Sequence, residues 1–338
     1  MVVGDVATLP LSPELRQALV DGGFTALQEL ARMGPVALAE ETGMNQDDAL
    51  YVLTVAEKFL GGQAAGGAAS AMVAATELYQ ATPQVLRTFC EPIDRILRGG
   101  LPVGVVTEVC GAPGAGKTQL AMQLSAIVQL PVSRGGLGGN AVYLDSEGSF
   151  TPERLSEIAG AHLERLRSAG GAGLPERLNV EGILDGVFYF RIHNGLQQLN
   201  TIETMKDFIV KNPKVKLVVI DSLVFHLRQD QQDATLRRQM VITMYQMLTS
   251  IARKQKVAVV VVNHLTTRIS KDSAKLVPVS NDAWGHVPTL RLALMAGERG
   301  NWLQIQKSPC HAQQAVPFRI TQGGIEAVQS TTQRPALT

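Results

Sequence analysis

The sequence predicts an α/β fold with a mainly parallel sheet, preceded by a small all-helical domain. Between residues 85 and 265, strand-like apolar runs alternate with helical stretches. The run 257–265, VAVVVVNHL, is continuously apolar until its end, as expected of a strand buried on both faces of a parallel sheet. Such alternation is typical of an α/β core that binds ligands at the carboxyl ends of its strands.

The 338 residues are enough for one large domain and one small domain. No apolar run approaches membrane-spanning length, and the N-terminus shows no signal-peptide pattern, so we expect no membrane association. Cys90, Cys110 and Cys310 show no paired spacing. We interpret all three as buried thiols in a reducing compartment, because disulfides and zinc sites need partners.

Charge is distributed unevenly along the chain. Residues 1–60 hold three Lys or Arg and nine Asp or Glu, a formal charge of −6, and the remainder carries +7. An acidic module repels nucleic acid phosphates. If the protein contacts nucleic acid, we expect the larger C-terminal part to do so.

Four segments follow from composition. Residues 1–60 form the helical domain, in which Ser12 caps a helix that starts at Pro13 and ends near two glycines. Residues 61–84 open with the flexible sequence GGQAAGGAAS and form a linker. Residues 85–330 form the α/β core, and residues 331–338 form a tail.

Within the core we expect strands at 105–110, 140–145, 186–194, 214–222 and 257–265. Helices follow the first strand, begin at Pro152 and run over 234–254. The segments 289–297, 301–309 and 316–328 are predicted as shorter antiparallel strands.

The segment GAPGAGKT follows an apolar strand and precedes a helix, which is the setting that the phosphate-binding P-loop pattern requires. Glycines let backbone amides approach phosphate oxygens, and the helix N-terminus adds unpaired amides. The lysine reaches the β- and γ-phosphates, and the threonine hydroxyl binds Mg²⁺. A Gly-rich turn without function is the alternative, which the strand and helix context disfavours. The predicted nucleotide-binding residues are Gly111, Gly114, Ala115, Gly116, Lys117, Thr118 and Gln119.

Two carboxylates follow other strands of the core. Asp221 closes an apolar strand, as an acid that holds Mg²⁺ does in P-loop enzymes. Its alternative role is a turn or helix cap. Glu147, after the strand 140–145, is the best candidate to orient or deprotonate an attacking water, and its alternative is a solvated turn residue.

Three further side chains are candidates at the same edge. Asn263 and His264 end a strand and either sense the γ-phosphate or are ordinary polar residues. Arg154, one turn into the next helix, either stacks on adenine or pairs with a neighbouring carboxylate.

Together these motifs resemble the eukaryotic and archaeal RecA-like strand-exchange recombinase family over residues 10–328. YLDSEGSFTPERL, KLVVIDS and VVVVNHL stand in the order and spacing of that family, and GFTALQELARMG resembles part of its small helical domain. TFCEPIDRILRGGLP, CGAPGAGKTQLAMQL, VFYFR, LVPVSNDAWGH and QKSPC resemble the recombinase paralogues, the C type in particular. The resemblance implies a RecA-like P-loop ATPase core.

The resemblance also implies roles. Lys117 and Glu147 would be catalytic, Thr118 and Asp221 would hold Mg²⁺, and Arg154 would stack on the base of ATP. Lys307, Ser308 and Pro309 would cap the nucleotide of a neighbouring protomer. The segments 227–237 and 266–286 would face DNA.

The DNA-facing segments offer several basic residues. They are Arg228, Arg237, Arg238, Arg268, Lys271 and Lys275. Asp230 and Asp233 accompany them in the first segment, so a solvated loop without DNA contact is the alternative there.

Three departures from the family pattern bear on function. His264 stands where the family usually has Gln, and Lys307 stands where the main recombinase is acidic. The self-assembly motif Phe-x-x-Ala of the main recombinase becomes Met72 to Ala75. Methionine fills an apolar pocket less specifically than phenylalanine does, which favours dedicated hetero-partners over a long homofilament.

The sequence therefore predicts a DNA-dependent ATPase of homologous recombination. It would act as a mediator with other paralogues and the main recombinase, on single-stranded or branched DNA. An assembly scaffold that uses ATP as an interface ligand is the alternative. A small-substrate kinase is disfavoured because no Arg-rich lid follows the core. The resemblance implies a nuclear location, with the cytoplasm as a second, although no basic import cluster is present.

Overall fold

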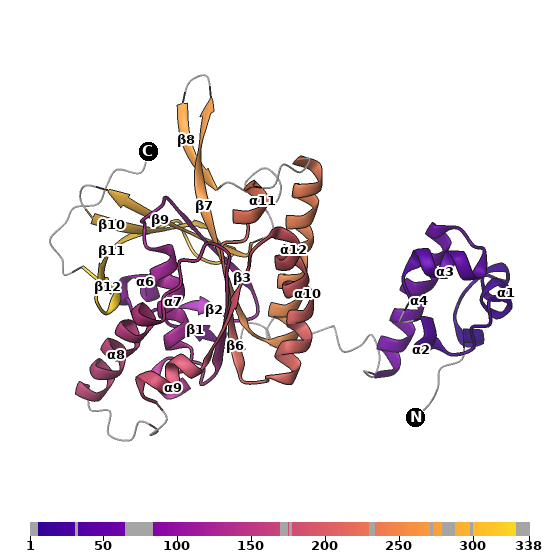
Figure 1. Ribbon diagram of the computed structural model, residues 1–338, viewed down its shortest axis with the longest axis horizontal. Helices are drawn as coiled ribbons and strands as arrows, with labels where there is room; N and C mark the ends of the chain where they lie inside the picture. The colour runs from indigo at the N-terminus through magenta and orange to yellow at the C-terminus, as the bar shows by residue number, and fades with distance from the viewer. Residues whose placement is uncertain are drawn as a thin grey trace. The chain divides into compact units, whose positions relative to one another are not determined.

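The computed structural model of the chain divides into two compact units, Met1–Thr82 and Pro83–Thr338 (Figure 1). The structure describes residues 6–30, 33–64, 84–169, 175, 178–229, 234–270, 273–278, 288–297 and 300–328. Within these ranges no helix is long and apolar enough to span a bilayer.

The first unit is helical, as predicted. Its elements are η1 (Val6–Thr8), α1 (Pro13–Asp21), α2 (Leu27–Leu30), α3 (Pro35–Thr42) and α4 (Gln46–Ala64). The predicted cap of α1 is confirmed, because the backbone N–H of Leu15 donates to Ser12 Oγ at 3.4 Å. Leu19, Leu27 and Leu38 are fully buried in the core of this unit, so its helices pack around a hydrophobic centre of their own.

The second unit is built on one large sheet. Its strands are β3 (Val106–Gly111), β4 (Asn140–Asp145), β5 (Val187–Arg191), β6 (Val215–Asp221), β7 (Ala258–Ser270), β8 (Ser273–Pro278), β9 (Leu290–Gly297), β10 (Gly300–Lys307), β11 (Ala315–Thr321) and β12 (Gly324–Ala327). The order across the sheet is β12-β11-β10-β9-β3-β7-β6-β4-β5, with β8 paired to β7 alone. A separate ladder joins β1 (Val85–Leu86) to β2 (Leu101–Pro102).

Helices cover both faces of the sheet (Figure 1). They are α6 (Glu91–Ile96), α7 (Lys117–Ile127), η3 (Val132–Arg134), α8 (Pro152–Ser168), α9 (Val180–Asp185), α10 (Gly195–Lys211), α11 (Phe225–Gln229) and α12 (Ala234–Gln255). Side chains of α6 to α9 pack into one hydrophobic core, and those of α10 and α12 pack into another on the opposite face.

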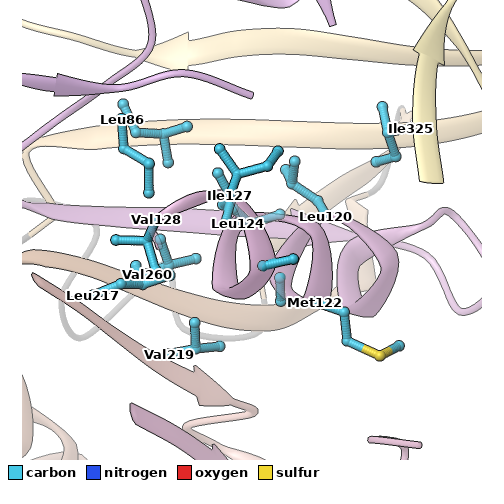
Figure 2. Close-up of a cluster of buried hydrophobic side chains, with 14 of the residues drawn as sticks. Leu86, Leu120, Met122, Leu124, Ile127, Val128, Leu217, Val219, Val260 and Ile325 are labelled. Atoms are coloured by element: carbon cyan, nitrogen blue, oxygen red, sulfur yellow. The ribbon is translucent and has the colours of Figure 1, made fainter. Parts of the chain in front are cut away.

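The central strands are mostly apolar on both faces because both faces are covered by helices. Leu217 and Val219 belong to the core around α7, whereas Val218 and Ile220 face α12. This is the period-two alternation of a strand with neighbours on both sides. Figure 2 shows the first core, where Leu217, Val219 and Val260 lie against the side chains of α7.

The predicted α/β class with a mainly parallel sheet is confirmed, with two corrections. β9 was expected to be antiparallel, but it pairs parallel to β3 on one side and antiparallel to β10 on the other. Cys310 is exposed, because it lies in the loop between β10 and β11, whereas Cys90 and Cys110 are buried as expected.

The sheet order brings four chain segments to one edge. β3, β7, β6 and β4 are neighbours and run parallel, so their carboxyl ends meet. Gly111 pairs with His264, and Asp145 pairs with Asp221. The polar residues that end these strands in sequence are therefore adjacent in space.

Candidate functional site

The P-loop lies between the end of β3 and the start of α7. A Cβ on Gly111 would come within 2.5 Å of the carbonyl oxygen of Leu294, so only glycine fits where β3 passes β9. Gly114 and Gly116 have φ angles of 76° and 98°. This backbone leads into the N-terminus of α7, where unpaired amides and the positive end of the helix dipole favour an anion.

Lys117 reaches back over the loop from the first turn of α7. Its Nζ donates to the carbonyl oxygens of Gly111 at 3.0 Å and Ala112 at 2.9 Å. Burial lowers the pKa of Lys117, and the carboxylates of Asp221 and Glu147 oppose that effect. Neutral carbonyl oxygens thus hold the ammonium group at the loop. A phosphate can replace them, because an ionised acceptor forms a stronger hydrogen bond than a neutral one.

Asp221 joins the P-loop helix to the end of β6. Its Oδ2 accepts hydrogen bonds from Thr118 Oγ1 and from the Tyr143 hydroxyl, each at 2.8 Å. Burial raises the pKa of Asp221 to about 6, with the nearby carboxylates of Glu147 and Asp145 acting in the same direction and the two hydrogen bonds acting against it. The sequence did not single out Tyr143, because a tyrosine within an apolar strand has no distinctive pattern.

Thr118 and Asp221 fit a magnesium–nucleotide complex better than a metal held by protein alone. The described residues contain no cluster of three or more His, Cys, Asp or Glu side chains that could hold a metal ion. Mg²⁺ commonly binds one or two carboxylates together with water and substrate phosphates. One hydroxyl and one carboxylate beside a phosphate loop provide that set.

Glu147 is held by the turn that follows β4. Oδ1 of Asp145 accepts from the backbone N–H groups of Glu147 at 3.1 Å and Gly148 at 2.7 Å, so Asp145 builds the turn. On the other side, His264 Nε2 lies 2.6 Å from Glu147 Oε1. Burial would raise the pKa of Glu147, but hydrogen bonding from His264 and Ser222, together with the charge of Lys117, outweighs it, and the pKa is lowered.

Asn263 and His264 point to opposite faces of β7, as successive strand residues do. Asn263 is fully buried, and its Nδ2 donates to Glu108 Oε1 at 2.6 Å and to the Tyr245 hydroxyl at 3.2 Å. Arg291 also donates to Glu108 in this buried network. Only His264 of the expected pair therefore reaches the Glu147 carboxylate.

Arg154 is fully engaged by protein groups. Its Nε donates to Gln119 Oε1 at 2.7 Å, and its Nη1 donates to Glu157 Oε2 at 2.6 Å and to the carbonyl oxygen of Gln322 at 2.8 Å. It also binds the carbonyl oxygen of Thr321. Of the two roles expected for Arg154, pairing with a neighbouring carboxylate is present, and the arginine ties α8 to α7 and to the turn between β11 and β12.

The interface and DNA candidates lie on elements other than the P-loop and α7. Lys307 is half-buried at the end of β10, where burial and the charge of Arg291 lower its pKa, and Pro309 is exposed in the loop that follows. Arg237 and Arg238 lie near the start of α12, the first half-buried and the second exposed.

The remaining basic candidates are placed only by their backbone. Arg228 lies in α11, and Arg268 pairs with Lys275 in the β7–β8 hairpin. Met72, Ala75 and Lys271 lie outside the described residues.

Comparison with known proteins places this architecture in a family. The sequence profile of the Rad51 family matches residues 82–328. A hamster protein (Cricetulus griseus) named DNA repair protein RAD51 homolog 3 is 35% identical over 333 residues, which cover 95% of this chain and 91% of that protein. The protein of the same name from Dictyostelium discoideum is 35% identical over 247 residues, covering 71% and 65%.

The chain belongs to the Rad51 family, whose RecA-like ATPase fold the second unit shows. Within the family its likeness is to the C-type paralogue, as the sequence motifs predicted.

The geometry of the P-loop yields a test by a matched pair of variants. A Cβ on Gly116 would meet Ile320 Cδ1 at 2.8 Å, whereas a Cβ on Gly114 would meet nothing within 4 Å. Both glycines have positive φ, so both alanine variants carry backbone strain, but only Gly116→Ala adds a clash. Gly116→Ala should lower the melting temperature and weaken ATP binding more than Gly114→Ala. Addition of Ile320→Ala should recover part of that difference, as measured by thermal unfolding and calorimetry. Equal losses of melting temperature and ATP affinity in the two single variants would contradict the close approach of Ile320 to Gly116.

Proposed function

We propose that this protein binds and hydrolyses ATP with Mg²⁺ and acts in DNA repair by homologous recombination. One observation carries the proposal. The P-loop lysine, the Thr118–Asp221 pair and Glu147 converge at the carboxyl edge of four adjacent strands. Phosphoryl transfer depends mainly on positioning and on stabilising charge, which such an edge supplies.

The residues divide by task in this proposal. Lys117 and the amides of Gly114 to Gly116 bind and neutralise the phosphates. Thr118 and Asp221 hold Mg²⁺, which would balance the charge that develops on the phosphate oxygens. Glu147 is the carboxylate that orients or deprotonates the attacking water. Gln119 and Arg154 lie together beside the loop, and we assign them to the base of the nucleotide.

We further propose a mediator role with other recombinase paralogues and the main strand-exchange recombinase. The two relatives are named DNA repair proteins, which supports work on DNA in the nucleus. The exposed guanidinium of Arg238 and the half-buried one of Arg237 offer contacts to the phosphates of single-stranded or branched DNA. Lys307 and Pro309, in and after β10, would face the nucleotide of a neighbouring subunit.

A scaffold role for ATP is the second candidate, and one contact favours it. Oε1 of Glu147 accepts a hydrogen bond from His264, so this oxygen is not free to accept the proton of an attacking water. An ATP molecule that is hydrolysed slowly would remain between subunits and stabilise their association by mass action.

The variants Lys117→Ala and Glu147→Gln separate these two functions. Lys117→Ala removes the charge that binds the phosphates, so it should abolish ATP binding and ATP-dependent association with partners. Glu147→Gln keeps the shape and removes the base, so it should leave binding intact and lower turnover by about 10²-fold or more. Calorimetry and a phosphate-release assay measure the two quantities. Turnover at the wild-type rate in Glu147→Gln would contradict the proposed role of Glu147 in hydrolysis. Normal ATP binding in Lys117→Ala would contradict the assignment of the P-loop as the ATP site.

The proposed DNA contacts can be tested through the salt dependence of DNA binding. Each lost phosphate contact should reduce the slope of log affinity against log salt by about 0.7 on single strands. The double variant Arg237→Gln/Arg238→Gln should therefore bind single-stranded DNA more weakly and with a slope flatter by about 1.4. Arg253→Gln/Lys254→Gln, at the far end of the same helix, removes the same charge and serves as the control. An equal change in both double variants would show that only net charge matters.

A further inference from the structure

His264 occupies the position at which β7 leaves the parallel core and continues into the β7–β8 hairpin (Figure 1). Its Nε2 lies 2.6 Å from Glu147 Oε1, and about one fifth of each side chain is exposed (19% and 21%). An ionised carboxylate only accepts hydrogen bonds, so Nε2 carries the hydrogen and donates it. This contact reaches across β6, which separates β7 from β4 in the sheet.

The contact affects what Glu147 can do. A general base needs a free oxygen that faces its water and a proton affinity suited to neutral pH. Here one oxygen is occupied, and the pKa of Glu147 is lowered although burial would raise it. Lys117, which also faces the carboxylate, acts in the same direction. In this arrangement Glu147 is a weak base.

The other end of Glu147 is also fixed. Its backbone N–H is bound by Asp145, whose second oxygen accepts from the backbone of Phe150 at 3.2 Å and from Tyr189 at 3.1 Å. The turn is therefore rigid, and the freedom of Glu147 lies in its side chain. His264 holds that end by a hydrogen bond of 2.6 Å, and hydrogen bonding from the Ser222 side chain also acts on the carboxylate.

We propose that His264 is a positioning residue that holds Glu147 in a restrained arrangement and thereby keeps ATP hydrolysis slow until the pair opens. The proposal rests on the proposed function, because it assigns to Glu147 the base of that reaction. The imidazole N–H donates to an ionised carboxylate, and such charge-assisted bonds are about twice as strong as bonds between neutral groups.

A merely structural role makes a different prediction. If the pair only braced β7 against the turn after β4, its loss would loosen the site and would weaken ATP binding together with turnover. Restraint predicts that the two parameters separate, because nucleotide binding depends on the P-loop and turnover depends on Glu147.

The experiment measures kcat and KM for ATP in the full-length protein carrying His264→Ala or His264→Gln. Release of one hydrogen bond should raise kcat of His264→Ala by about threefold to tenfold, with KM within about twofold of the wild-type value. His264→Gln should fall between wild type and His264→Ala. The exposed His193, in the segment between β5 and α10, provides the matched control His193→Gln, which should behave as wild type. Thermal unfolding verifies that each variant is folded.

Two outcomes overturn the proposal. One is a kcat of His264→Ala that is equal to or below the wild-type value while ATP binding is intact. The other is turnover in His264→Ala that remains at the level of Glu147→Gln, because release of the base should unmask hydrolysis. Failure of the proposed function looks different: Glu147→Gln would then turn over as fast as wild type, or the wild-type protein would not bind ATP at all. The double variant His264→Ala/Glu147→Gln should show none of the increase in kcat expected for His264→Ala.

Discussion

The hydrogen bond from Thr118 to Asp221 joins the first turn of α7 to the end of β6, and the site is arranged around it. It fixes the P-loop helix against the centre of the sheet, where β7 alone separates β6 from β3, the strand from which the loop emerges. It also holds a carboxylate that is 1% exposed, at a cost in solvation that raises its pKa. A buried carboxylate that accepts from two hydroxyl groups beside a phosphate loop suits a metal ion.

Like charges gather around this bond because parallel strands end at one edge. Asp145, Glu147 and Asp221 lie together, and each accepts hydrogen bonds from different donors. Asp145 accepts from the backbone amides of its turn, Asp221 from two hydroxyl groups, and Glu147 from His264. Lys117 is the cation that faces both Asp221 and Glu147. Under the proposed function, the end of β7 therefore matters for chemistry at the P-loop, although β6 carries the proposed metal ligand and the turn after β4 carries the proposed base.

The fold class and the P-loop were predictable because the signals for both lie within short, contiguous segments of the sequence. A glycine-rich loop between an apolar strand and a helix needs no tertiary information, and alternation of strands and helices fixes the class. The opposite orientations of Asn263 and His264 were not predicted, because the segment was treated as a polar strand end without regard to which face each residue occupies. The parallel pairing of β9 depends on a partner far away in the sequence, and the role of Tyr143 depends on the adjacent β6. Those features depend on how the strands pair in the sheet. The residue pattern within one segment does not determine that pairing.

The most direct test asks whether Asp221 is the group through which Mg²⁺ acts on nucleotide binding. Calorimetric titration of ATP into the wild-type protein and into Asp221→Asn, each in excess Mg²⁺ and in EDTA, measures this. We expect Mg²⁺ to tighten ATP binding to the wild type by about tenfold or more, equivalent to about 1.4 kcal/mol. In Asp221→Asn that effect should be nearly absent, while binding in EDTA is retained. The same Mg²⁺ effect in both proteins would contradict the assignment of the site.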